Sequence, residues 1–276
     1  MMRDKLKNLL FFTYMLTFLS GANFQLFASY IDDSHPSENF NQRVKYLVIH
    51  CIGLSEEEAL KTLTKSGEHG GGGVSAHWLV PSEKPAGVEK FPLYSLVKEE
   101  DRAWHAGVSY WRGDPNINSI SIGVEFHSPG YAAGGDFHNF GTFSEEQILA
   151  GFQLLKDIRG RYQIPPENVV YHSDIAPDRK TDPGINFPGK RLHDEYEVGM
   201  WPDQAYNSSG GPSSTRAVTE LLKKIGYKIE PSDELDAYSR KVVSAFQLHY
   251  RPQDYSGDID AETGFIAAQL VKQYNL

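Results

Sequence analysis

The chain contains very little cysteine: among its 276 residues there is one, Cys51. A single thiol cannot form an intramolecular disulfide, so the sequence excludes a small secreted domain held together by disulfides. Positive charge is also scarce, because 27 Lys and Arg face 36 Asp and Glu, and the net charge is −9. This balance argues against nucleic acid as the main partner.

Long hydrophobic runs are scarce, and the clearest one lies near the N-terminus. Basic residues within the first seven positions precede an apolar run over 9–19, and small residues follow at 20–22. The run is short for a membrane span, so we expect residues 1–28 to be an export signal that is removed, with an uncleaved anchor as the alternative. No cysteine follows the run. We therefore expect a periplasmic or cell-envelope protein that is not a lipoprotein, with a polar tether at 29–42.

Short apolar runs alternate with helix-like segments between residues 43 and 203. The predicted strands share β-type apolar patterning and lie at 46–49, 75–80, 93–97, 119–126 and 169–171. Ser55 with Glu58 and Ser144 with Gln147 have the spacing of helix N-terminal capping boxes, and the second begins a helix with a core-facing side. We predict an α/β fold with a mixed central β-sheet flanked by helices.

The composition changes after residue 203. A linker rich in Ser, Gly and Pro is predicted at 204–214, and helix-like segments follow at about 215–225, 236–250 and 261–273. A three-helix bundle of this size is marginal alone, so we expect the segment 215–276 to pack on its neighbour.

Two histidines stand at the ends of predicted strands, His50 after the run 46–49 and His172 after 169–171. Asp182 and Lys180 follow in a loop rich in proline. Two imidazoles and one carboxylate are a catalytic type of zinc ligand set, because they leave a fourth position open. Glu125 lies on the face of its strand that carries small residues, which leaves room for a ligand.

Each of these residues also has a plainer interpretation. The loop could be an ordinary connection with a buried histidine, and Glu125 could face solvent. His77 and His105 suit hydrogen-bonding partners better than ligands, and Cys51 cannot easily share a metal with His50 because adjacent strand residues point to opposite faces. The aromatic stretch around Trp104 and Trp111 suits either a ligand groove or core packing.

The chain resembles the zinc-dependent N-acetylmuramoyl-L-alanine amidase family, the type-2 group that includes phage T7-type lysozymes and peptidoglycan recognition proteins. The matching residues occur in the family's order and spacing, and they are 48–50, 104–107, 121–125, 172–177 and 179–184. The segments 243–247, 250–252 and 257–263 resemble a peptidoglycan-binding three-helix module. The resemblance implies a zinc amidase domain at 43–203 and a peptidoglycan-binding domain at 215–276.

The resemblance implies that Zn²⁺ is held by His50, His172 and Asp182, with Glu125 as catalytic base and Lys180 stabilising the oxyanion. The expected reaction is hydrolysis of the amide between N-acetylmuramic acid and L-alanine in peptidoglycan or muropeptides. Candidate substrate contacts are six residues around these motifs: Cys51, Ile52, His77, Trp104, His105 and Arg179. Cys51 and Ile52 depart from the aromatic or His and then Thr that often follow the first ligand in the family.

The sequence also suggests three alternative functions. They are a non-catalytic peptidoglycan receptor using the same groove, a cytosolic amidase restricted to anhydro-muropeptides, and a zinc endopeptidase acting within the stem peptide. We expect a monomer whose partner is peptidoglycan or muropeptides, with no nucleic acid and no stable protein partner.

Overall fold

The computed structural model describes residues 32, 34–39, 42–67, 73–128, 141–206 and 210–276. The chain forms two units, Met1–Asn41 and Gln42–Leu276. The export signal expected at 1–28 lies outside the described residues, as does part of the expected tether. The described helices and strands all belong to the second unit.

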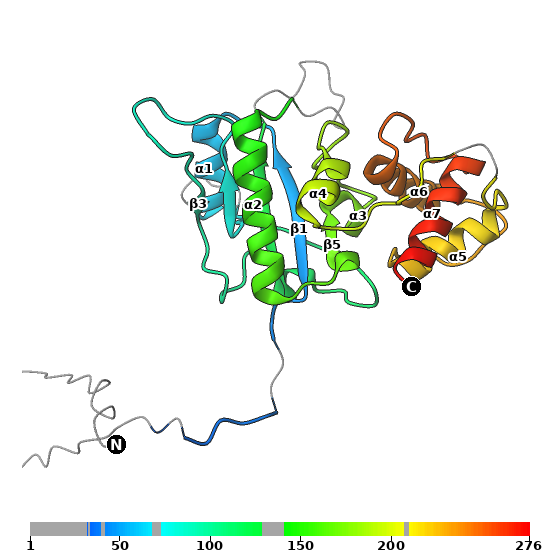
Figure 1. The fold of residues 1–276 in the computed structure, drawn as a ribbon, viewed down its shortest axis with the longest axis horizontal. Helices are drawn as coiled ribbons and strands as arrows, with labels where there is room; N and C mark the ends of the chain where they lie inside the picture. Colours follow the sequence, from blue (N-terminus) through cyan, green and yellow to red (C-terminus); the bar gives the residue numbers. More distant parts are fainter. Residues whose placement is uncertain (1–31, 33, 40–41, 68–72, 129–140, 207–209) are drawn as a thin grey trace, which may run out of the picture. The chain divides into compact units, whose positions relative to one another are not determined.

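Five strands form one sheet in the order β3-β2-β4-β1-β5 (Figure 1). The strands are β1 (Tyr46–Ile52), β2 (Trp78–Val80), β3 (Tyr94–Ser95), β4 (Ser121–His127) and β5 (Val169–Tyr171). β3 is antiparallel to β2 and the other pairs are parallel. The predicted mixed sheet is confirmed.

Two of the strands are shorter than predicted. The sequence predicts strands at 75–80 and 93–97, but β2 and β3 cover only part of these ranges. Directly upstream of β2 the N–H of His77 still donates to the carbonyl of Gly123 on β4, but the N–H of Ser75 donates to the carbonyl of Trp104, in a loop, at 3.1 Å. The loop that carries Trp104 is thereby fixed along the sheet.

Helix α2 (Glu145–Tyr162) covers one face of the sheet (Figure 1). Its apolar side packs with alternate residues of β1 and β4, among them Leu47, Ile49 and Val124. The intervening residues of β1, Tyr46 and Val48, belong to a second core on the opposite face. His50 continues that second series, so strand alternation directs it away from α2.

The predicted helix starts are confirmed. Ser55 caps α1 (Glu56–Thr64) in a reciprocal capping box with Glu58. The Ser144 hydroxyl accepts a hydrogen bond from the N–H of Gln147 and caps α2. Such caps satisfy backbone N–H groups that the helix itself leaves without a partner.

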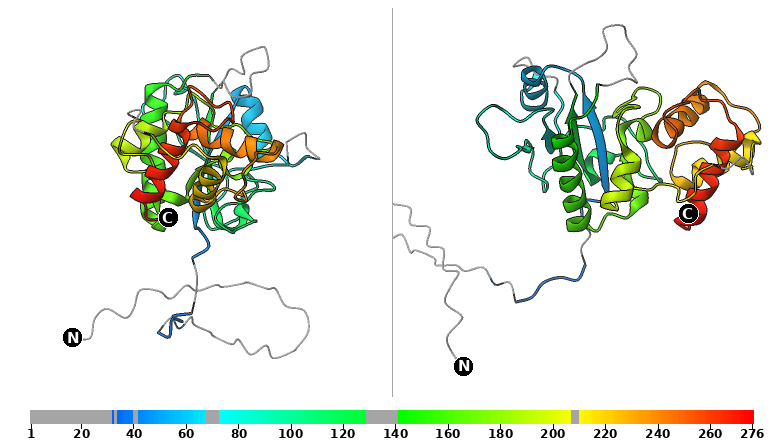
Figure 2. Two further views of the ribbon diagram at one scale, coloured as in Figure 1. Left: turned by 90° about the vertical axis from the view of Figure 1, so that its right-hand side faces the viewer. Right: turned by 45° about the horizontal axis from the view of Figure 1, so that its top comes forward.

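Three C-terminal helices follow at the predicted positions: α5 (Thr215–Ile225), α6 (Ala237–Tyr250) and α7 (Ala261–Gln273). They lie to one side of the sheet domain in the right-hand view of Figure 2 and in front of it in the left-hand view. One apolar core joins the two parts, since Val48 and Val170 of the sheet share it with Val218 and Leu222 of α5. The prediction that the bundle packs on its neighbour is confirmed.

Trp111 lies in this shared core. It is 1% exposed, its ring meets Tyr227 edge-on at 4.8 Å, and its indole N–H donates to the carbonyl of Glu167. Core packing is therefore the correct interpretation for Trp111, and a groove floor is not.

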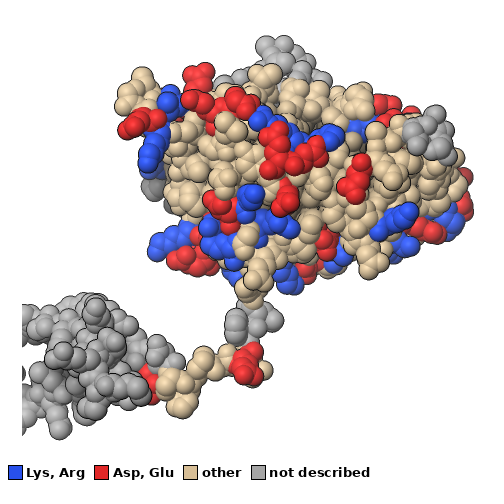
Figure 3. Space-filling view, viewed as in Figure 1, with Lys and Arg blue, Asp and Glu red and all other residues tan. Residues whose placement is uncertain are grey.

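The surface carries charges of both signs. Figure 3 shows acidic and basic side chains interspersed on the face it presents. None of the described helices combines the length and the hydropathy needed to cross a membrane.

Candidate metal centre

The parallel strands β1, β4 and β5 bring the candidate residues to one edge of the sheet. His50 on β1 pairs in register with Glu125 on β4. His172 directly follows β5 as the first residue of the short helix α3 (His172–Ile175). In sheets of this kind the carboxyl ends of the strands are where ligands bind.

Asp182 is brought to the same place by a backbone contact with α3. The N–H of Ser173 donates to the carbonyl of Asp182 at 3.0 Å. The loop between His172 and Asp182 is thus closed by a hydrogen bond from Ser173, which is adjacent to one candidate ligand, to Asp182, which is the other.

Three donor atoms converge at this point. His50 Nδ1 lies 2.9 Å from His172 Nδ1 and 3.4 Å from Asp182 Oδ2, and His172 Nδ1 lies 3.1 Å from the same oxygen. Zinc bonds of about 2.1 Å place neighbouring ligand atoms of a tetrahedron about 3.4 Å apart, close to these separations. All three residues are buried. Among the described residues, this is the cluster with metal-ligand geometry.

A hydrogen-bonded relay determines which nitrogen of His50 is free. The Ser121 hydroxyl donates to the carbonyl of Ile117 at 2.7 Å, so it accepts from His105 Nε2–H at 3.0 Å. Burial, followed by the nearby histidines, lowers the pKa of His105 well below its usual value, so its ring is neutral. His105 Nδ1 then accepts from His50 Nε2–H at 2.9 Å, which leaves the lone pair of His50 Nδ1 exposed to the site.

His172 reaches the same state through a simpler contact. Its Nε2 lies 3.4 Å from the carbonyl of Ala106, which can only accept, so Nε2 carries the hydrogen. In the neutral tautomer of His172 that this contact favours, the two Nδ1 lone pairs face each other beside a carboxylate oxygen. Such an arrangement repels unless a cation joins the three atoms, and neutral imidazoles with a carboxylate are ligands that Zn²⁺ accepts. The donor set fits zinc.

The electrostatic surroundings favour the deprotonated form of two of the three donors, His50 and Asp182. Burial and the neighbouring His172 lower the pKa of His50 to about 4. Burial alone would raise the pKa of Asp182, but His172 and His50 lower it well below the usual range. A metal ion would thus meet little competition from protons at these atoms.

Glu125 is placed to exchange protons at the site. Its Oε1 lies 4.0 Å from His50 Nδ1, and its buried Oε2 has no hydrogen-bond partner among the described residues. Burial and the charge of Asp182 raise its pKa well above the usual value, while Lys180 opposes this shift. An unpartnered carboxylate oxygen at a metal site is suited to accept a proton.

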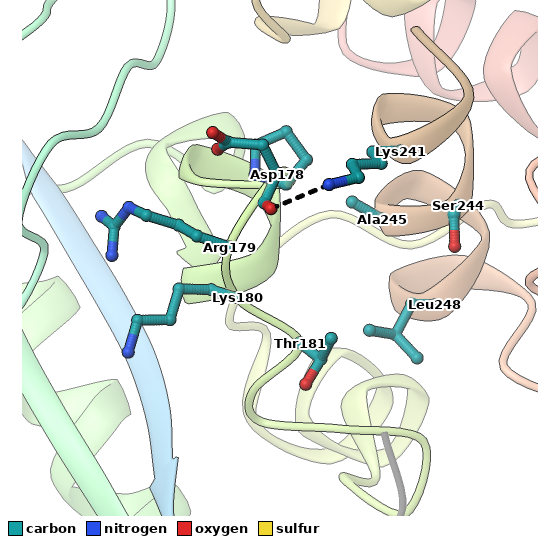
Figure 4. A pocket seen from close by; sticks show the side chains of 9 residues that line it. Asp178, Arg179, Lys180, Thr181, Lys241, Ser244, Ala245 and Leu248 are labelled. Carbon is teal, nitrogen blue, oxygen red and sulfur yellow. Dashed lines mark hydrogen bonds between the residues drawn. The ribbon is translucent and has the colours of Figure 1, made fainter. Parts of the chain in front are cut away.

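Lys180 belongs to the loop that leads to Asp182. Its charge acts on the pKa values of both His50 and Glu125, which places it within electrostatic range of the site. In Figure 4 the side chains of Arg179 and Lys180 extend away from α6, while Thr181 lies on the side of α6. Arg179 binds the carbonyls of Ala106 and Val108 and so ties this loop to the loop of His105.

The other candidate substrate contacts have different surroundings. His77 is fully buried, accepts from the N–H of Gly123 and bonds the carbonyl of Asp101. Cys51 is also buried, whereas Ile52 is half-buried and Trp104 is 59% exposed. Trp104 is the one of these with a broad surface to offer to a substrate.

Sequence reasoning missed several residues that support the site. It gave Ser121 no role in the relay, and it assigned no function to His249 or Tyr227. Both of these bind Asp174, a buried carboxylate two residues after His172. The sequence offers no local signal of this contact beyond the charge of Asp174 itself.

A mixed sheet whose strand ends bring two histidines, an aspartate and a facing glutamate together has the architecture of a metal-dependent hydrolase. The family described as N-acetylmuramoyl-L-alanine amidase matches residues 40–185. The N-acetylmuramoyl-L-alanine amidase AmiD of Escherichia coli K12 is 39% identical over 251 residues, which is 88% of each protein. The chain therefore belongs to the N-acetylmuramoyl-L-alanine amidase family.

Solved structures agree with this assignment. The structure of E. coli AmiD in complex with its substrate anhydro-N-acetylmuramic acid-L-Ala-D-γ-Glu-L-Lys has a TM-score of 0.77 and 39% identity, covering 88% of this chain and 95% of that one. Pseudomonas aeruginosa AmpDh3 in complex with anhydromuramic pentapeptide has a TM-score of 0.73 and 35% identity, with coverage of 89% and 98%. In both cases the likeness extends over the C-terminal helices as well as the sheet domain, because so little of either chain is left out.

Proposed function

We propose that this protein hydrolyses the amide bond between N-acetylmuramic acid and L-alanine in peptidoglycan and muropeptides, with Zn²⁺ held by His50, His172 and Asp182. The observation that carries the proposal is the convergence of three buried donor atoms beside the carboxylate of Glu125, whose Oε2 has no hydrogen-bond partner among the described residues. The identity to AmiD, whose solved complex contains a muropeptide substrate, supports the choice of bond.

In this mechanism the chain's own residues bind, orient and move protons. When bound, zinc supplies Lewis acidity, which makes a water molecule more acidic and a carbonyl carbon more electrophilic. Glu125 takes the proton of the attacking water on its carboxylate and returns it to the nitrogen of the leaving L-alanine. The ammonium of Lys180 stabilises the negative charge that develops on the carbonyl oxygen.

Burial of Glu125 favours this exchange, because a carboxylate whose pKa is raised is both a stronger base and a useful acid near neutral pH. Trp104, the residue before His105, offers an exposed aromatic face, which suits stacking on a sugar ring.

We further propose that residues 1–28 direct export to the periplasm or cell envelope, and that residues 215–276 bind peptidoglycan. A second, weak contact with the wall would raise the effective concentration of the catalytic domain at its substrate. The protein would act as a monomer, without nucleic acid or a stable protein partner.

The test is a digest of purified sacculi by residues 29–276, with and without a chelator, followed by mass spectrometry of the products. We expect free stem peptides that begin with L-alanine, their loss on chelation and their return with Zn²⁺. Products cut within the stem would identify an endopeptidase instead. Tight binding without any release, by protein shown to hold zinc, would identify a non-catalytic receptor.

A further inference from the structure

The helix that carries His172 is held by the C-terminal bundle. α3 contains only four residues, His172–Ile175, which is too short to be stable without tertiary contacts. Its first residue is a proposed zinc ligand, and its second binds the carbonyl of Asp182. Its third residue, Asp174, is 2% exposed and faces the bundle. Whatever fixes Asp174 therefore also fixes two of the three proposed ligands.

The bundle supplies the side-chain partners of the Asp174 carboxylate. The Tyr227 hydroxyl donates to Oδ1 at 2.6 Å, and His249 Nδ1 lies 2.8 Å from Oδ2. The remaining contact is local, from the N–H of Tyr171 to Oδ2 at 2.8 Å. Tyr227 is 1% exposed and His249 is 7% exposed. A buried carboxylate needs such partners, because it would otherwise be left without compensation for its lost hydration.

The same helix α6 touches the polypeptide on both sides of α3. The ring of His249 stacks on that of Tyr171, the residue before His172, with centroids 3.6 Å apart. The ammonium of Lys241 donates to the carbonyl of Asp178 at 3.1 Å, in the loop that leads to Lys180 (Figure 4). A cavity of about 210 Å³ separates the rest of this loop from α6. The bundle thus contacts the chain before α3 at Tyr171 and after α3 at Asp178, whereas the side chain of Lys180 extends away from α6.

We propose that the C-terminal bundle is a structural part of the metal centre, and that Tyr227 and His249 are positioning residues which set His172 and Asp182 for zinc through Asp174. The inference rests on the zinc site proposed above. It gives the bundle a role in the catalytic domain that is separate from binding to the wall.

The test compares variants that keep the packing but remove the bonds to Asp174. Tyr227→Phe combined with His249→Phe retains three aromatic rings at the contact and leaves Asp174 only the N–H of Tyr171. We expect zinc to bind this variant at least about tenfold more weakly, as is typical when a partner of a metal ligand is lost. The visible spectrum of the Co²⁺-loaded protein should change as well, because it reports the geometry of the ligands.

Tyr274→Phe is the matched control. The Tyr274 hydroxyl bonds the backbone of Trp201 in the same interface and does not touch α3. This variant should lower the unfolding midpoint but leave zinc affinity and the Co²⁺ spectrum unchanged. If the double variant acted only by weakening the interface, Tyr274→Phe should lower the zinc affinity as well.

A second comparison separates hydrogen bonding from packing at position 249. His249→Asn keeps an N–H donor near the place of Nδ1 but loses the stacked ring, whereas His249→Phe keeps a ring and loses the donor. We expect the Asn variant to bind zinc more tightly than the Phe variant. The opposite order would overturn the proposal in favour of packing alone.

Unchanged zinc affinity and an unchanged Co²⁺ spectrum in the folded double variant would also overturn it. If the double variant does not fold, Tyr227→Phe, which removes one oxygen atom, decides by the same criterion. Wild-type protein that binds zinc no better than His172→Ala would instead contradict the zinc site itself, so the two failures are distinguishable.

Discussion

His50 and Glu125 stand side by side on adjacent parallel strands, paired in register, with His50 Nδ1 4.0 Å from Glu125 Oε1. The proposed first ligand and the proposed base are therefore spaced by the hydrogen-bond ladder of the sheet. Sites built on strands hold their geometry more closely than sites built on loops. A substitution that changes only a side chain on these strands should therefore leave the backbone in place.

Glu125→Gln should remove activity and keep the metal. The amide has nearly the same shape as the carboxylate but cannot take a proton from water, so we expect a rate loss of about 10²–10⁴. The variant should bind zinc and muropeptide like the wild type, measured by metal titration and by equilibrium binding. Full activity in a zinc-loaded variant would show that another group is the base.

His105→Phe should weaken zinc binding without removing a ligand. The relay through His105 and Ser121 keeps the hydrogen of His50 on Nε2. We expect zinc affinity to fall by about 10–100-fold, as for other partners of ligand histidines, and Ser121→Ala to cause a smaller loss. Competition with a chelator measures both. His193→Phe in α4 (Gly189–Tyr196) is the control, and equal affinities in all of these proteins would contradict the relay.

Acid should weaken the fold through Glu99, a residue away from the metal centre. Burial would raise its pKa, but hydrogen bonds from Arg161 and Trp78 lower it below the usual value. The stabilisation is therefore complete above the unfolded-state pKa of about 4.3 and is lost as the pH falls through the lower value of the folded state. Partial exposure and screening keep the effect at about 1 kcal/mol or less.

The measurement is urea unfolding of wild type and Glu99→Gln in the presence of a chelator at several pH values. The difference in unfolding free energy should be largest near pH 7 and should shrink below about pH 4.3. Glu100→Gln, next to it and 74% exposed in its side chain, should differ little from wild type throughout. A difference in unfolding free energy that grows as the pH falls would contradict a stabilising role for the ionised carboxylate of Glu99.

Gly226→Ala should destabilise the whole second unit. Gly226 has φ +142°, and an added Cβ would lie 2.6 Å from Arg112 Cγ and 2.8 Å from Trp111 Cε2. We expect a loss of about 2–4 kcal/mol in one unfolding transition, because bundle and sheet share a core. Gly113→Ala, with φ +94° and no atom within 4 Å of the new Cβ, should show only the cost of backbone strain, about 1 kcal/mol. Two separate transitions would contradict the shared core.

The sequence was sufficient for the parts of the site that follow from local pattern. Strand alternation placed Glu125 on the face with Ser121 and Gly123, and the structure puts all three opposite His50, Tyr46 and Val48 in register. The C-terminal helices were predictable within a residue because their caps and apolar spacing are local. Resemblance to a family, rather than periodicity, suggested the roles that we propose for Asp182 and Lys180.

The contacts that depend on distant pairing were not predictable. Asp174 meets Tyr227 and His249 across 53 and 75 residues, and neither partner is marked by its neighbours in the chain. The role of His105 depends on the register of β1 with β4 and on the path of a loop. The bounds of β2 and β3 were not predictable for the same reason. Ser75 bonds to Trp104, about 30 positions away in the chain, instead of extending the hydrogen-bond ladder of the sheet.

Cys51, the single thiol of the chain, adjoins His50 on β1 and is 7% exposed. Burial, with Glu125 and Asp182 nearby, raises its pKa well above the usual value, so the reactive thiolate is suppressed while the strand stays closed. A thiol reagent can then modify Cys51 only when the residues that cover it move away. The rate of labelling therefore measures how often the structure around the end of β1 opens, without any engineered cysteine.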